Sequence, residues 1–195
     1  MGRLLGEIYH RDGLDVAGGV VERTAVRAVI LRGRELLLLH SPHNGDYKFP
    51  GGGVERGETG DDALRRELEE ECGAQLNAIG EEYGYIIEYS AAAEDDVAVF
   101  RMVSRYIRCE IADEFGPQRL EQYEQDLGLT PTWVDVAEAL QVNEAALHAD
   151  AAQLDTVRWR RRETLALRLI QGELLSPRQQ PDLTCHDTQE ERSAE

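Results

Sequence analysis

The sequence predicts an α/β sandwich with mixed strand pairing, and three observations support this fold class. Short β-rich runs alternate with turn residues through the first half of the chain. A helical pattern with clearly marked ends interrupts these runs, and longer helical patterns follow in the second half. With 195 residues, 42% of them hydrophobic, the chain is long enough to bury one sizeable core.

The expected strands come mainly in antiparallel pairs. Arg32-Gly33-Arg34 separates the second and third β-rich runs and is typical of a hairpin turn. The fourth and fifth runs form a longer pair around a loop at residues 91–96. The predicted strands cover residues 5–10, 24–31, 35–40, 83–89, 97–111 and 131–134.

One helix is well marked between Thr59 and Gly73. Thr59 precedes Asp62 by three residues, which is a variant of the capping box, and Gly73 suits the left-handed residue after a helix. Apolar residues recur on one face of this helix at Leu64, Leu68 and Cys72. Further helices are expected over residues 118–127, 136–147 and 151–170, the last of them ended by Gly172. We therefore expect a polar lead-in (1–23), a folded domain (24–172) and a flexible polar tail (173–195).

The charge and composition of the chain restrict its partners. A formal net charge of −17 repels nucleic-acid backbones and anionic membranes, so we expect neither as a partner. The densest apolar patch, Leu36–Leu39, is strand-sized, and residues 1–10 lack a secretory signal pattern. Three widely separated cysteines suggest no disulfide framework. These features favour a cytoplasmic protein, and a phosphorylated small molecule fits it only if metal ions supply positive charge.

Three carboxylates are expected on one face of the marked helix. Glu67, Glu70 and Glu71 are three and four residues apart, whereas Glu69 points elsewhere. Such a trio repels itself, and a hard divalent cation such as Mg²⁺ or Mn²⁺ would relieve the repulsion. A solvated acidic helix face is the plainer interpretation of a glutamate-rich stretch. Here, however, the three glycines at residues 51–53 open the segment and let a backbone approach a ligand closely.

The segment from Gly52 to Ala74 resembles the Nudix box. Gly52 is followed after five residues by Glu58, and after seven more by Arg66-Glu67-Leu68-x-Glu70-Glu71-x-Gly73. Ala74 is the one departure, since the family usually has a larger aliphatic residue there. The resemblance implies a Nudix-type α/β/α sandwich with a mixed sheet and a loop–helix–loop catalytic motif.

The resemblance also implies the roles of the box residues. Glu67, Glu70 and Glu71 would coordinate Mg²⁺ or Mn²⁺, while Arg66 and Glu58 would hold the loop and the helix together. The family's general base comes from the box, here Glu67 or Glu70, or from a later loop. Outside the box the candidates are Glu121 and Glu124, although a solvated helix is the expected state of that acidic segment.

Substrate recognition is less clear from the sequence. Gly51, Gly52 and Gly53 are candidate substrate-binding positions, and so is Lys48, which is the only lysine among the 21 basic residues. Lys48 would neutralise a phosphate or hold a loop carboxylate. Six aromatic residues are candidates to stack on a base, although a core or sheet-face place is the favoured interpretation of each: Tyr47, Phe49, Tyr83, Tyr85, Tyr89 and Tyr106. An arginine cluster at residues 158–162 is expected to be a solvated helix face.

Family members imply several possible activities. The main expectation is metal-dependent hydrolysis of a phosphoanhydride bond in a nucleoside diphosphate linked to another group. Alternatives are a nucleoside triphosphate pyrophosphohydrolase and a non-catalytic nucleotide sensor, which typically has an eroded box. An isomerase of isoprenoid diphosphates shares the fold but requires histidine and cysteine ligands that the sequence does not offer. Nudix proteins are often dimers, so a homodimer is a further expectation.

Overall fold

A computed structural model describes residues 2–92, 99–149 and 158–175 of the chain. In this part, the strands are β1 (Leu4–Tyr9), β2 (Val20–Val29), β3 (Leu31–Arg32), β4 (Glu35–Ser41), β5 (Asp46–Lys48), β6 (Ala74–Ala91), β7 (Val99–Phe115) and β8 (Thr130–Asp135). The helices are α1 (Gly60–Glu67), the π-helical segment η1 (Leu68–Cys72), α2 (Gln122–Leu127), α3 (Val136–Ala149) and α4 (Trp159–Leu175).

The strands form two sheets with mixed pairing. In the first sheet the order is β1-β6-β7-β2, with β6 and β7 antiparallel and both outer pairs parallel. In the second sheet β4 pairs antiparallel with β3, β5 and β8. The predicted hairpin turn at Gly33 is therefore confirmed, but it joins β4 to the short β3. The chain leaves the first sheet at Val29, so β2 pairs with β7 instead.

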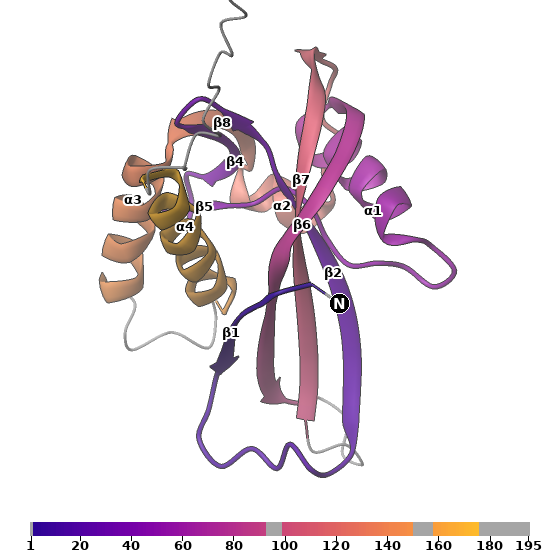
Figure 1. Cartoon of the computed structure of the whole chain (residues 1–195), viewed down its shortest axis with the longest axis vertical. Coiled ribbons are helices and arrows are strands. Elements are labelled where there is room, and N and C mark those ends of the chain that lie inside the picture. Colours follow the sequence, from indigo (N-terminus) through magenta and orange to yellow (C-terminus); the bar gives the residue numbers. More distant parts are fainter. Residues whose placement is uncertain (1, 93–98, 150–157, 176–195) are drawn as a thin grey trace, which may run out of the picture.

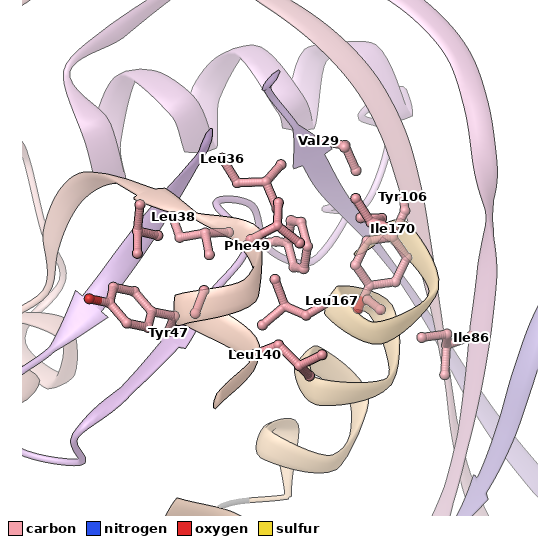
Figure 2. Close-up of a cluster of buried hydrophobic side chains, with 14 residues drawn as sticks. Val29, Leu36, Leu38, Tyr47, Phe49, Ile86, Tyr106, Leu140, Leu167 and Ile170 are labelled. Atoms are coloured by element: carbon pink, nitrogen blue, oxygen red, sulfur yellow. The ribbon is translucent and has the colours of Figure 1, made fainter. Parts of the chain in front are cut away.

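Helices cover the sheets on two sides, as Figure 1 shows, with α1 on one side and α3 and α4 on the other. The run Leu36–Leu39 on β4 is buried on both faces and alternates between two cores. Leu36 and Leu38 join the core under α3 and α4, where Phe49, Tyr106 and Leu167 also pack (Figure 2). Leu37 and Leu39 join the core under α1 with Leu64, Leu68 and Cys72. The predicted α/β/α sandwich and the apolar stripe of the marked helix are confirmed.

The marked helix begins as predicted and changes its winding halfway. Thr59 accepts a hydrogen bond from the Asp62 backbone N–H in a complete capping box, and Gly73 is left-handed with a φ of 65°. From Leu68 to Cys72, however, the winding is π-helical. A π-helix has wider turns than an α-helix, so it changes the directions of the side chains that the spacing of the box suggests.

One expectation about the second half is wrong. Gly172 does not end the last helix, because α4 continues to Leu175. The predicted start of this helix at residues 151–157 lies outside the described residues, as does the polar tail from residue 176. No helix among the described residues is long and apolar enough to cross a membrane.

Candidate active site

The glycine loop lies along the outer edge of β2. The backbone N–H groups of Val26 and Ala28 donate to the carbonyls of Gly52 (2.9 Å) and Pro50 (2.8 Å), and Val54 N–H donates to the Thr24 carbonyl (2.9 Å). The loop thus extends the first sheet by a short irregular segment. This pairing places the side chains of β2 next to the loop.

Each of the three glycines has a physical reason to lack a side chain. Gly51 has a φ of 127°, and a Cβ there would lie 2.2 Å from the Val26 carbonyl oxygen. A Cβ on Gly52 would lie 2.1 Å from a carboxylate oxygen of Glu67. A Cβ on Gly53 would lie 2.6 Å from the guanidinium of Arg23. The adjacent glycines Gly52 and Gly53 therefore leave room for a carboxylate and a guanidinium, respectively.

Arg66 joins the loop to the helix. Its guanidinium donates to both carboxylate oxygens of Glu58 (2.9 and 3.0 Å) and to the Gly53 carbonyl (3.1 Å). The same side chain also contacts Glu67 (2.8 Å) and Glu70 (3.3 Å). Hydrogen bonds from Arg66 lower the pKa of Glu58, which keeps this carboxylate ionised. A single arginine thus orients three of the box glutamates.

Glu71 is separated from the other two predicted ligands. Its carboxylate is buried beneath the loop, where it accepts from the Gly51 backbone N–H (2.6 Å) and from Lys48 Nζ (3.1 Å). Burial raises the pKa of Glu71 to about 7, although Lys48 and the Gly51 N–H oppose this shift. Of the two roles expected for Lys48, the structure shows the contact with a carboxylate.

Two buried side chains, one on α3 and one on α4, bind the backbone just before the glycine loop. Asn143 bonds both the N–H and the carbonyl of Tyr47 at 2.8 Å, and Glu163 accepts from the Phe49 N–H at 3.1 Å. With Gly51 bonded to Glu71, every second N–H of this segment donates to a buried side chain. The approach to the glycine loop is therefore rigidly positioned.

A cleft of about 680 Å³ runs past the loop, a volume suited to a small molecule. Its acidic part is formed by Glu67, Glu70, Glu121, Glu124 and Asp126. Its other part, called the sheet part below, is formed by residues in or next to the first sheet and by two residues of α4: His10, Glu88, Phe100 and Met102, with Trp159 and Arg162. No predicted site residue lies in the sheet part. Of the predicted residues, Glu58 and Glu71 do not line the cleft, whereas the following do: Lys48, Gly51, Gly52, Gly53, Arg66, Glu67 and Glu70.

The sheet part contains a buried ion-pair network. Glu88 accepts from Arg162 (2.6 Å) and contacts His10 (3.0 Å), and Arg162 also contacts Glu163 (2.7 Å). Burial raises the pKa of Glu88, but Arg162 and His10 outweigh it, and the pKa is lowered. Since Glu163 binds the Phe49 N–H, the network reaches from the wall of the cleft to the glycine-loop segment.

The residues present suit a divalent cation in part. Glu67 and Glu70 offer hard oxygen donors in the cleft, and burial raises the pKa of Glu67 although Arg66 opposes this shift. In the described ranges, however, no three His, Cys, Asp or Glu side chains converge closely enough to hold an ion. Glu71 keeps unused acceptor positions, because a carboxylate has about four of them. The carboxylate oxygens suit a divalent cation by their chemistry, but the side chains of Glu67, Glu70 and Glu71 do not converge on one point.

Several expectations about the surroundings of the site are wrong. None of the six aromatic candidates lines the cleft, where Phe100, Tyr123 and Trp159 lie instead. The alternative, a place in the core, holds for Tyr47, Phe49 and Tyr106. Glu124 is not solvated but buried, and its oxygens accept from Tyr123 Oη (2.8 Å) and the Glu121 N–H (3.0 Å). Nor is the 158–162 cluster a solvated face, because two of its arginines are buried: Arg160 and Arg162. Their carboxylate partners Asp46 and Glu88 are distant in sequence, and among the carboxylates of the described residues only Glu163, which Arg162 also contacts, lies next to the cluster.

Comparisons with known proteins identify the family of the chain. A family model described as the NUDIX domain matches residues 21–167. None of the curated proteins compared with the chain matches it. A MutT NUDIX hydrolase from Burkholderia pseudomallei is a similar solved structure, with 23% identity over 60% of this chain and 85% of that chain and a TM-score of 0.44.

Two further solved structures show similar figures. The E. coli ORF135 protein has 24% identity over 71% of this chain and 94% of that chain, with a TM-score of 0.44. A UDP-X diphosphatase has 16% identity over 60% of this chain and 52% of that chain, with a TM-score of 0.43. The family match itself, over residues 21–167, includes strands β3 to β8, nearly all of β2, helix α1 and the box at residues 52–74, whereas β1 lies outside it. The chain therefore belongs to the NUDIX domain family, the hydrolase family that its box predicts.

Proposed function

We propose that the protein hydrolyses a phosphoanhydride bond in a nucleoside diphosphate linked to another group, with Mg²⁺ or Mn²⁺ as cofactor. One observation carries this proposal: Glu67 and Glu70 line a small-molecule cleft beside the glycine loop, and Arg66 orients both. The products would be a nucleoside monophosphate and a phosphorylated remainder.

Glu67 and Glu70 would hold the cation, and Glu71 would join them through its unused acceptor positions. The cation supplies the positive charge that an anionic diphosphate needs in this acidic cleft, and it makes water a better nucleophile. Arg66 and Glu58 keep the two carboxylates beside the loop. Lys48 and Glu71 keep the Gly51 backbone in place.

The proton of the attacking water requires an acceptor. Glu67 and Glu70 remain candidates within the box, with Glu121 and Glu124 outside it. Both of the latter line the cleft, and they also cap α2 through a reciprocal capping box. Activity of Glu121→Gln and Glu124→Gln, each compared with the unfolding midpoint of the same variant, would separate a proton acceptor from a helix cap.

A substrate panel with Mg²⁺ tests the proposal. It should contain nucleotide sugars, dinucleoside polyphosphates, ADP-ribose and nucleoside triphosphates, with products separated by chromatography. Release of a nucleoside monophosphate from the linked diphosphates supports the proposal. Preferential release of pyrophosphate from triphosphates indicates the pyrophosphohydrolase instead. No turnover by folded, metal-loaded protein contradicts both.

A pair of variants distinguishes an enzyme from a nucleotide sensor. Glu70→Gln should reduce kcat by at least about 100-fold, within the range expected for a group that acts directly on the reaction. Glu69→Gln is the matched control, because Glu69 lies on the same segment, is 64% exposed and contacts only Arg119 among the described ion pairs. Nucleotide binding without turnover in the wild-type protein would favour the sensor.

A further inference from the structure

Arg23 stands beside the glycine loop and has no role in the site described above. It lies on β2 in alternation with Ala25 and Arg27, and all three line the cleft. In the register of the sheet, Arg23 is opposite Met102, and Met102 is opposite Glu88. Arg23 therefore lies in the row of residues that runs from the loop across the sheet part of the cleft.

The guanidinium of Arg23 rests on the last glycine of the loop. A Cβ on Gly53 would lie 2.6 Å from its Nη2 and 2.8 Å from its Nε, whereas a Cβ on Gly52 would meet the Glu67 carboxylate. The backbone of Gly53 does not have a positive φ, so only the neighbouring guanidinium opposes a side chain there. Two adjacent glycines thus make room for opposite charges.

Arg23 differs in its partners from four other cationic side chains of the cleft. Arg66, Lys48 and Arg162 are each paired with glutamates. Arg27 donates to the Gly51 carbonyl. Within residues 2–92, 99–149 and 158–175, the side chain of Arg23 makes no hydrogen bond or ion pair. The same holds for Arg158, which lines the cleft beside Trp159, but it is Arg23 that lies against the glycine loop. In a chain with a net charge of −17, a guanidinium that faces a cleft without a carboxylate partner is available for an anionic ligand.

We propose that Arg23 binds the phosphoryl group of the substrate that lies away from the box glutamates. A guanidinium presents paired N–H donors that match two phosphate oxygens, and such charge-assisted pairs are strong. The glycine loop would then set the direction of the diphosphate, with one phosphoryl group toward Glu67 at Gly52 and the other toward Arg23 at Gly53. The diphosphate nature of the ligand rests on the proposed function, whereas the anion site itself does not.

Calorimetric titration with inorganic pyrophosphate in the presence of Mg²⁺ tests this site. Arg23→Ala should weaken binding by about tenfold or more, in line with the loss of a hydrogen bond between charged groups. The matched control is Arg101→Ala. Arg101 lies on β7 next to Met102, so it points to the opposite face of the sheet, where it pairs with Glu22. Equal affinity of Arg23→Ala and the wild type, or equal losses in both variants, would overturn the proposal.

Gly53→Ala provides a second test that keeps every charge. Its methyl group should displace the Arg23 guanidinium and weaken pyrophosphate binding, and the double variant should bind like Arg23→Ala alone. If Gly53→Ala weakens binding equally with and without Arg23, the glycine acts through the loop and the proposed pairing is wrong. Unfolding midpoints of all variants show whether each one is folded.

The two proposals fail in different ways. If the wild type hydrolyses a panel member and Arg23→Ala has the same kcat/KM and pyrophosphate affinity, the function stands and the anion site falls. If no panel member is hydrolysed but Arg23→Ala weakens pyrophosphate binding, the anion site stands without the proposed function.

Discussion

Arg66 and Arg162 each bind several glutamates in the wall of one cleft, but in different surroundings. Arg66 is 27% exposed, and its farthest glutamate partner lies eight residues away. Arg162 is 7% exposed, as is its partner Glu88, which lies 74 residues away. Water screens the first cluster, whereas the second depends on its own pairing. We therefore expect Arg66 to matter mainly for the reaction and Arg162 mainly for the stability of the fold.

Removing Arg162 should give the largest effect on stability. Arg162→Met leaves Glu88 and Glu163 buried without their main cation, and a broken buried pair typically costs about 3–5 kcal/mol. The free energy of unfolding in urea measures this loss. Arg168→Met is the control on the same helix, since Arg168 is 57% exposed and pairs with the partly exposed Glu144; its cost should stay below about 1 kcal/mol. Similar costs for both variants would remove the contrast between the two clusters.

The first cluster was predictable because its contacts are local. The capping box from Thr59 to Asp62, the left-handed Gly73 and the Glu58–Arg66 pair all lie within the box segment. Residue spacing therefore carries their geometry. The winding of η1 was not predictable, because the shift from α- to π-helical hydrogen bonds has no counterpart in the spacing of residues.

The second cluster depends on tertiary structure. His10, Glu88 and Arg162 meet only because β1 pairs in parallel with β6 and α4 packs over the sheet. Nothing near any of the three in the sequence indicates its partner. Arg23 is a similar case, since its place beside Gly53 follows from the pairing of the loop with β2. Alternation along a strand shows which residues share a face, but the neighbours of the strand come from the fold.

Arg66→Lys tests the partly exposed cluster around Arg66. Lysine keeps the charge but loses the planar fork that contacts Glu58, the Gly53 carbonyl and the box glutamates together. We expect kcat/KM to fall by about tenfold or more, equivalent to about 1.4 kcal/mol. Stability should change by about 1 kcal/mol or less, because the cluster is partly exposed. Full activity of a folded Arg66→Lys variant would show that the charge alone suffices.

Acid titration of Glu88 should give the smallest effect. It tests whether pairing with Arg162 stabilises the ionised carboxylate in the buried cluster. Arg162 and His10 lower the pKa of Glu88 from its ordinary value of 4.5 despite burial, so the folded state favours the ionised carboxylate. The stabilisation is present above pH 4.5 and is lost as the pH falls through the lowered pKa. Glu88→Gln does not titrate there. The difference in unfolding free energy between the wild type and Glu88→Gln should therefore shrink from pH 6 to pH 3, by about 1.4 kcal/mol for each unit of lowering. A difference that grows on acidification would mean that burial outweighs the pairing with Arg162, and the two arginine clusters would then differ less than their exposure suggests.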